Sequence, residues 1–141
     1  MKVLIVEDDA IQAGRLESLI HTKFSGVAVV KIDTELKFRK SLPSIKDGEY
    51  RVALIDMMLR WTDPSPDMEQ PPEEILKEGF FVGGLRCRKL LLEKRIPSII
   101  FTVLNRETSL PRGEDIEFVQ KGPSYQPVLD KLNKYLGPAT C

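Results

Sequence analysis

Five short apolar runs recur along the chain, and each has the length of a β-strand. They span residues 2–6, 27–32, 51–56, 97–102 and 116–120. The first, third and fourth runs are apolar at consecutive positions rather than at alternate ones, so both faces of these strands must be covered. This pattern is typical of the central strands of a parallel sheet that has helices on both sides.

Helical patterns lie between these runs. Residues 10–24 repeat apolar side chains at spacings of three and four, which predicts an amphipathic helix with Asp9 as its N-cap. Pro43 should break or kink the next helix. Strands that alternate with helices in this way predict an α/β fold with right-handed crossovers. The further predicted helices cover residues 34–47, 80–95 and about 128–136.

Two segments interrupt the alternation. Residues 61–78 hold four prolines and many acids, and they are too long for an ordinary strand-to-helix loop, which usually has about 2–6 residues. We therefore expect an inserted loop whose prolines exclude helix and strand for much of its length. Residues 103–115 leave little room for a helix between the fourth and fifth strands. The chain is predicted to be one domain, residues 1–141, that carries this insertion.

Charge and composition exclude several classes of protein. Lysine plus arginine and aspartate plus glutamate number 21 each, so no overall field favours nucleic acid. The chain has no run of about 18 apolar residues that could cross a membrane, and no signal peptide is recognisable. Cys87 is predicted to be a buried small hydrophobe and Cys141 a loose terminal thiol. A reduced, cytoplasmic protein fits this composition best.

Two groups of polar side chains point to no further chemistry. His21 is the only histidine and is expected to lie partly exposed on the first helix, so a Ser-His-Asp or Cys-His site is not plausible. A basic cluster in the helix predicted over 80–95 is expected to be a solvated face, with nucleic-acid contact a distant second interpretation. The members of this cluster are Arg86, Arg88, Lys89, Lys94 and Arg95.

Polar residues of another kind collect at the carboxyl ends of the predicted strands. Glu7 and Asp8 follow the first strand, and Asp56 ends the third. Thr102 ends the fourth strand and Lys121 follows the fifth. Because the ligand site of an open parallel sheet lies beyond these ends, the carboxylates converge if the first and third strands are neighbours. Like charges about 4 Å apart repel by roughly 4 kcal/mol at an effective dielectric of about 20, so this group needs a proton or a cation.

The chemistry of these side chains suits phosphoryl transfer. Carboxylate oxygens suit Mg²⁺, which typically binds one or two of them and keeps positions for water and for a phosphate oxygen. Lys121 would add a fixed positive charge and Thr102 a hydroxyl donor. Asp56 could itself be the nucleophile and become an acyl phosphate. Each residue alone has a simpler explanation, such as a helix cap or a solvated loop, but their combination at four strand ends favours a site.

At these residues the sequence resembles the receiver domain of two-component response regulators. The motifs that carry the resemblance are VLIVEDD, LIDMML, IIFT and FVQKG, and it covers residues 2–136. The resemblance implies a flavodoxin-like, doubly wound sheet of five parallel strands in the order 2-1-3-4-5, with five helices on its two faces. It also implies a cytoplasmic regulatory domain rather than an enzyme. Such a domain catalyses only its own phosphorylation and dephosphorylation.

The resemblance also implies roles for individual residues. Glu7, Asp8, Asp56 and the backbone carbonyl of Met58 would bind Mg²⁺. Asp56 would accept a phosphoryl group from a sensor histidine kinase or a phosphotransfer protein, and this would switch binding to an unknown downstream protein. The implied partners include neither nucleic acid nor a membrane, and a homodimer is left open. The residues that would bind the phosphoryl oxygens are Thr102 and Lys121, and those that would switch are Thr102 and Phe118.

The sequence departs from the family pattern at several positions. Val103 stands where a small residue is usual, and Gly122 separates the lysine from the proline that commonly follows it. The residues from Met57 to Arg60 lack the usual proline. With the insertion and the short fourth helix, these changes predict an altered output surface. Since Phe118 has no hydroxyl group, we expect it to be buried even without phosphorylation.

Two alternatives remain beside a stand-alone phosphoacceptor receiver. One is a pseudo-receiver that binds partners without phosphorylation, which Val103 and the stunted fourth helix favour. The other is a phosphatase of the haloacid dehalogenase type. That family needs a second carboxylate two residues after the nucleophile, where this chain has Met58, so this alternative is weaker.

Overall fold

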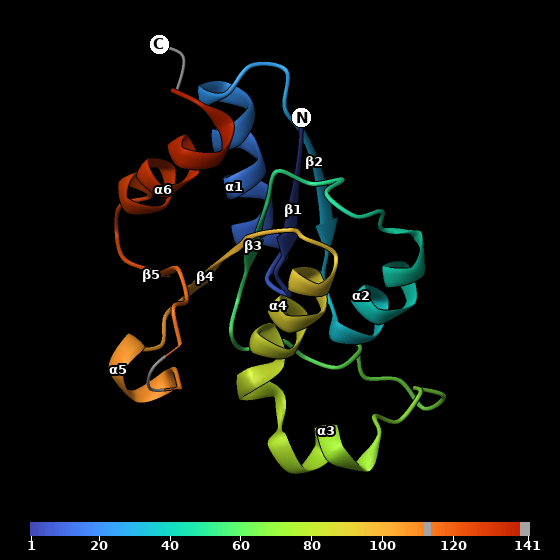
Figure 1. The fold of residues 1–141 in the computed structure, drawn as a ribbon. Helices are drawn as coiled ribbons and strands as arrows, with labels where there is room; N and C mark the ends of the chain where they lie inside the picture. Colours follow the sequence, from blue (N-terminus) through green and yellow to red (C-terminus); the bar gives the residue numbers. More distant parts are fainter. Residues whose placement is uncertain (112–113, 139–141) are drawn as a thin grey trace.

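A five-stranded parallel sheet forms the centre of the protein, in the order β2-β1-β3-β4-β5 (Figure 1). The structure is a computed structural model and describes residues 1–111 and 114–138; Cys141, the expected terminal thiol, lies outside these residues. The order confirms the predicted doubly wound α/β fold. The strands are β1 (Lys2–Val6), β2 (Ala28–Ile32), β3 (Val52–Ile55), β4 (Ser98–Thr102) and β5 (Phe118–Gln120).

Helices cover both faces of the sheet. Helices α1 and α6 lie on one face, and α2 and α4 on the other (Figure 1). Short helices α3 and α5 lie beyond the carboxyl ends of the strands, on the side away from the N-terminus. The helices are α1 (Ala10–Lys23), α2 (Glu35–Ser41), α3 (Glu73–Glu78), α4 (Gly83–Glu93), α5 (Arg106–Ser109) and α6 (Gln126–Leu136), and two 3₁₀ turns cover Leu42–Ser44 and Phe80–Val82.

Helix boundaries follow the local signals that predicted them. The Asp9 carboxylate accepts hydrogen bonds from the backbone N–H groups of Ile11 and Gln12 at 3.0 and 3.2 Å, so Asp9 caps α1 as expected. Helix α2 gives way to a 3₁₀ turn that contains Pro43. Pro127 lies in the first turn of α6, where its missing N–H group removes no helical hydrogen bond.

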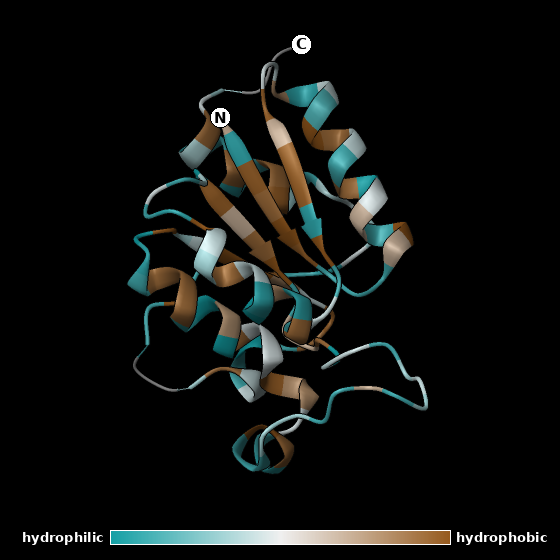
Figure 2. Cartoon of the chain, turned by 90° about the vertical axis from the view of Figure 1, so that its right-hand side faces the viewer, coloured by the Kyte–Doolittle hydropathy of each residue, from teal (hydrophilic) through white to brown (hydrophobic). Residues whose placement is uncertain are grey.

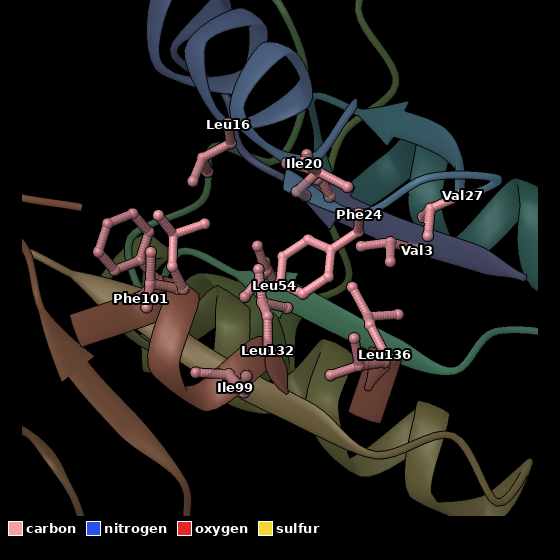
Figure 3. Packing of buried hydrophobic residues seen from close by; sticks show 14 of the residues in the cluster. Val3, Leu16, Ile20, Phe24, Val27, Leu54, Ile99, Phe101, Leu132 and Leu136 are labelled. Atoms are coloured by element: carbon pink, nitrogen blue, oxygen red, sulfur yellow. The ribbon is translucent and has the colours of Figure 1, made fainter. Parts of the chain in front are cut away.

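Two apolar cores hold the layers together. The first joins one face of the sheet to α1 and α6, and Figure 3 shows Phe24, Leu54 and Leu132 meeting in it. The second joins the other face to α2 and α4 and includes Cys87, which is fully buried as expected. Because the four residues of β3 contribute to both cores, they are at most 1% exposed. This double burial explains why the central runs are apolar at consecutive positions (Figure 2).

The insertion differs from its prediction near its end. Residues 61–72 form no helix or strand, as the prolines predicted, but Glu73–Glu78 form α3. The described residues therefore contain six α-helices, not the five that the resemblance implied. The six residues after Pro72 contain no proline, and two glutamates in the first turn favour a helix N-terminus. The helix between β4 and β5, α5, has only four residues. This segment corresponds to the fourth helix that the resemblance implied, and it is short as predicted.

Within the described residues, no helix has both the length and the apolar character that a membrane span requires.

Candidate functional site

The ends of β1 and β3 bring three carboxylates together. The backbone N–H of Asp56 donates to the Val6 carbonyl at 2.9 Å, which continues the β1–β3 pairing to the strand ends. As a result, carboxylate oxygens of Glu7, Asp8 and Asp56 lie within 4.8 Å of one another. Glu7 and Asp56 are buried, whereas Asp8 is half-buried. The predicted convergence of these side chains is therefore present in the structure.

Lys121 reaches this cluster from the end of β5, which lies two strands away from β3 in the sheet. Its backbone N–H donates to the Thr102 carbonyl at 2.7 Å, which places it just beyond β5. Its Nζ donates to Glu7 Oε1 at 2.5 Å and to Asp56 Oδ2 at 3.0 Å. The Lys121 side chain is only 9% exposed, so these ion pairs are poorly screened by water. One buried ammonium group thus faces two buried carboxylates.

Protonation of the cluster reflects this imbalance of charge. Burial raises the pKa of Glu7 to about 7; the nearby Asp56 charge adds to the rise, and Lys121 partly opposes it. Burial alone would lower the pKa of Lys121, but Glu7 and Asp56 more than offset that effect and raise it. Near neutral pH the cluster can relieve its repulsion by binding a proton at Glu7. A divalent cation would relieve it in the same way, so the donor set suits Mg²⁺.

Asp56 and Thr102 are the remaining polar groups at this edge of the sheet. The backbone N–H of Met58 donates to Asp56 Oδ1 at 3.2 Å, which leaves the Asp56 carboxylate held from both sides. Thr102 is fully buried, and its hydroxyl group has no hydrogen-bond partner among the described residues. An unpaired buried hydroxyl costs about 1–3 kcal/mol, so Thr102 retains a donor for a group that binds at the strand ends.

Asp8 has a partner that the sequence analysis did not assign. The backbone N–H of Arg60 donates to Asp8 Oδ2 at 3.2 Å, and Arg60 Nε lies 3.6 Å from the same oxygen. The Arg60 guanidinium also pairs with Asp63 in the insertion. The available signal was the absence of the usual proline from the residues Met57 to Arg60. Arg60 connects the acidic cluster to the insertion.

Glycines at the start of α4 allow this helix to lie against the Asp56 segment. The backbone N–H of Gly84 donates to the Met57 carbonyl at 2.8 Å. A Cβ atom on Gly84 would lie 2.8 Å from both the Asp56 carbonyl carbon and the Met57 Cα, closer than any ordinary contact. The Gly83-Gly84 pair was the available signal, and the sequence analysis passed over it. Helix α4 thus supports the backbone that presents Asp56.

Phe118 is half-buried, so the expectation of full burial is wrong. One side of the ring packs on the second core. Its ring centroid is 5.9 Å from the guanidinium carbon of Arg106 in α5. Because α5 is a single turn, an arginine side chain rather than a full helix covers this region. Val103, which follows Thr102, is 53% exposed.

The predicted solvated face of basic residues is wrong for Arg88, whose side chain is 13% exposed and donates to the Asp115 carbonyl, and it is also wrong for Arg86. This side chain is 11% exposed, and its guanidinium forms a bidentate pair with Glu35, at 2.7 Å from Nη2 and 2.9 Å from Nε. Glu35 is 1% exposed and also pairs with Arg39. The structure therefore uses Arg86 to join α4 to α2. The partner lies 51 residues away, so local periodicity could not reveal the pair.

Comparison with known proteins adds information on the fold. No protein-family model matches this chain, and no curated protein does. Solved structures match along most of the chain. Response regulator TrrA from Thermotoga maritima, in complex with Mg(2+)-BeF, is 17% identical with a TM-score of 0.65, over 96% of this chain and 98% of that one.

Two further structures give the same result. A two-component response regulator from Clostridium difficile is 15% identical with a TM-score of 0.66, over 96% of this chain and 95% of that one. The BeF3-activated N-terminal receiver domain of RstA from Klebsiella pneumoniae is 18% identical with a TM-score of 0.65, over 96% and 98%. Together with the strand order, these similarities show that the chain has the fold of response regulator receiver domains.

Proposed function

We propose that the chain is a single receiver domain, residues 1–141, that works in the cytoplasm as a phosphoacceptor of a His-Asp phosphorelay. Asp56 takes the phosphoryl group from a phosphohistidine of a sensor histidine kinase or a phosphotransfer protein. The product then alters binding to a downstream protein. The observation that carries this proposal is the double contact of Lys121 with Glu7 and Asp56 at the strand ends. That contact places a cation beside the carboxylate that would carry the phosphoryl group.

The side chains divide the work of phosphoryl transfer between them. An Asp56 oxygen attacks phosphorus while the bond from phosphorus to the histidine nitrogen breaks. Lys121 Nζ and the Thr102 hydroxyl would then bind phosphoryl oxygens, and Thr102 would gain the partner that it lacks among the described residues. Mg²⁺, held by Glu7, Asp8, Asp56 and the Met58 carbonyl, would neutralise charge on the phosphoryl oxygens. The proposed switch involves Thr102 and the half-buried Phe118.

Intact mass spectrometry after incubation with acetyl phosphate and Mg²⁺ tests this function. We expect one added phosphoryl group on the wild-type protein and none on Asp56→Asn. Asp33→Asn is the matched control, because Asp33 lies outside the carboxylate cluster. Labelling of Asp56→Asn at the wild-type level, or a wild-type protein that takes up no phosphoryl group from any donor, would contradict the proposal.

One observation favours a second candidate, a pseudo-receiver that binds partners without phosphorylation. Arg60 pairs with Asp8, and Lys121 pairs with Glu7 and Asp56, so each of the three carboxylates already has a cationic partner within the chain. The same labelling experiment separates the two functions, since a pseudo-receiver would remain unmodified. The phosphatase alternative gains nothing from the structure, because Met58 contributes a backbone N–H and no acid near Asp56.

A further inference from the structure

The insertion forms a groove beside the carboxylate cluster. The groove has a volume of about 490 Å³, and Asp8 and Arg60 are among the residues that line it. Six apolar side chains line it, from the segment after Asp56, the insertion and the 3₁₀ turn before α4. We call this feature the insertion groove, and these six residues are Leu59, Trp61, Met68, Ile75, Leu76 and Phe80.

Hydrogen bonds hold the walls of the insertion groove in place. The backbone N–H of Leu36, in α2, donates to the Trp61 carbonyl at 2.8 Å. The Trp61 indole N–H donates to the Glu69 carbonyl at 3.0 Å, which closes the proline-rich loop over its own start. The backbone N–H of Leu59 donates to the Phe80 carbonyl at 3.1 Å. Both ends of the insertion are therefore attached to the folded domain, and the groove is largely pre-formed.

Apolar surface is concentrated at this groove. Seven large apolar side chains are exposed among the described residues, and three of them lie within residues 76–81. Leu76 is 62% exposed, Phe80 is 51% exposed and Phe81 is 54% exposed. The Phe80 and Phe81 rings stack with their centroids 4.4 Å apart. Clustered exposed apolar residues of this kind mark a surface that a partner covers.

The charge around the groove indicates which partner fits. Residues 61–78 contain six acids and one lysine, although the whole chain has equal numbers of acidic and basic residues. Four of these acids form ion pairs: Asp63 with Arg60 and Lys37, Glu69 with Lys40, Glu73 with Lys77, and Glu78 with Arg86. Asp67 and Glu74 are exposed and have no ion pair among the described residues. The two arginines that line the groove add little free positive charge, because Arg60 pairs with Asp8 and Arg86 pairs with Glu35. The surface is therefore apolar in the centre, and two unpaired carboxylates, Asp67 and Glu74, adjoin the groove residues Met68 and Ile75 in the sequence.

We propose that the insertion groove binds a segment of a partner protein in which apolar side chains are flanked by lysine or arginine. The apolar side chains would cover Leu76 and Phe80, and the basic residues would face the acids of the insertion. The proposal goes beyond the phosphoacceptor function and depends only on the groove. Since Asp8 lines the groove and belongs to the carboxylate cluster, the bound segment would lie near Asp56.

Fluorescence of Trp61 gives a direct assay, because Trp61 is the only tryptophan and lines the groove. The probe is an acetylated, amidated helical peptide without tryptophan, with leucine at every third and fourth position and lysine elsewhere. A second peptide replaces each lysine with glutamate. We expect saturable binding of the lysine peptide to the full chain, and binding of the glutamate peptide that is at least about tenfold weaker, as for roughly 1.4 kcal/mol.

A pair of leucine variants places the binding on the groove. Leu76→Ser should weaken binding of the lysine peptide by at least about tenfold. Leu92→Ser should leave it unchanged, because Leu92 is 47% exposed on α4 and does not line the groove. Both leucines are exposed, so both variants should fold, which circular dichroism would check.

The results that overturn the proposal are equally specific. Equal affinity for the two peptides, equal affinity of wild type and Leu76→Ser, or no saturable binding would each overturn it. Labelling of the same proteins by acetyl phosphate is the separate test of phosphoacceptor function, and Leu76→Ser should be labelled like wild type. Absence of labelling in all proteins would overturn the phosphoacceptor function, whereas the proposal that the groove binds a partner segment would still be tested by the peptides alone.

Discussion

Gly84→Ala tests whether α4 supports the backbone that presents Asp56. The added methyl carbon would lie 2.8 Å from both the Asp56 carbonyl carbon and the Met57 Cα. Carbon atoms make favourable contacts at about 3.5–4.0 Å. One end of α4 would therefore have to move by roughly 1 Å, or the Asp56 segment would have to move instead.

The cost follows from what such a movement disturbs. The hydrogen bond from the Gly84 N–H to the Met57 carbonyl, 2.8 Å long, would lengthen, at about 0.5–1.5 kcal/mol. Cys87 and Leu91 on the same helix are fully buried, so a shift of α4 strains a packed core, at about 1–3 kcal/mol. The substitution should lower the free energy of unfolding by about 2–4 kcal/mol, a large share of the usual 5–15 kcal/mol.

Equilibrium unfolding in urea measures this change. The matched control is Gly14→Ala, because Gly14 is also helical and an added Cβ there would have no atom within 4 Å. Alanine is the better helix former by about 1 kcal/mol, so the control should be neutral or stabilised. If Gly84→Ala were as stable as wild type while Gly14→Ala behaved as expected, the close approach of α4 to Asp56 would be wrong.

Three further predictions concern charged groups. The folded-state pKa of Glu7 is raised from 4.5 to about 7, so its contribution to stability is present below pH 4.5 and is lost as the pH rises through 7. Metal-free wild type should thus lose on the order of 3 kcal/mol relative to Glu7→Gln between pH 4.5 and 8 in urea unfolding, whereas parallel pH profiles would contradict the shift. Arg60→Ala should tighten Mg²⁺ binding by up to about fivefold in titration calorimetry, because the half-exposed pair with Asp8 is worth at most about 1 kcal/mol. Arg51→Ala, an exposed control, should leave the Mg²⁺ affinity unchanged. Equal affinities of wild type and Arg60→Ala would mean that Arg60 does not compete with Mg²⁺ for Asp8. Arg86→Ala removes the main cationic partner of the buried Glu35 and should lower the free energy of unfolding by about 3–5 kcal/mol. Arg95→Ala, at an 81% exposed side chain, should lower it little, and similar losses in both variants would show that the Arg86 pair does not stabilise the fold.

The surface around Phe118 bears on how a signal could leave the domain. Phe118 is half-buried and covered by Arg106 rather than by a full helix. The short α5 and the exposed Val103 leave little of the surface that a longer fourth helix would form. The insertion groove is an apolar feature of about 490 Å³ that Asp8 lines, so a partner segment bound there would lie near the proposed phosphorylation site.

Local and periodic features were readable from the sequence alone. The apolar runs predicted every strand to within two residues, because burial on both faces demands consecutive apolar side chains. Asp9 acts through hydrogen bonds to nearby N–H groups, and Pro43 acts through its missing N–H, so their local effects on α1 and α2 were predictable. The meeting of Glu7, Asp8 and Asp56 was predictable for a different reason. In a parallel sheet all carboxyl ends share one edge, and the strand order then decides which of them are neighbours.

Only the tertiary structure decided which distant side chains pair. Arg60 is 52 residues from Asp8, and Arg86 is 51 residues from Glu35. Whether a charged side chain faces water or a partner depends on which elements pack together, and periodicity within one helix contains no information about that. The contact of Gly84 with the Asp56 backbone, the half-burial of Phe118 and the insertion groove arise in the same way. Each depends on the relative placement of elements that are separate in the sequence, and this placement is set by packing of the whole core.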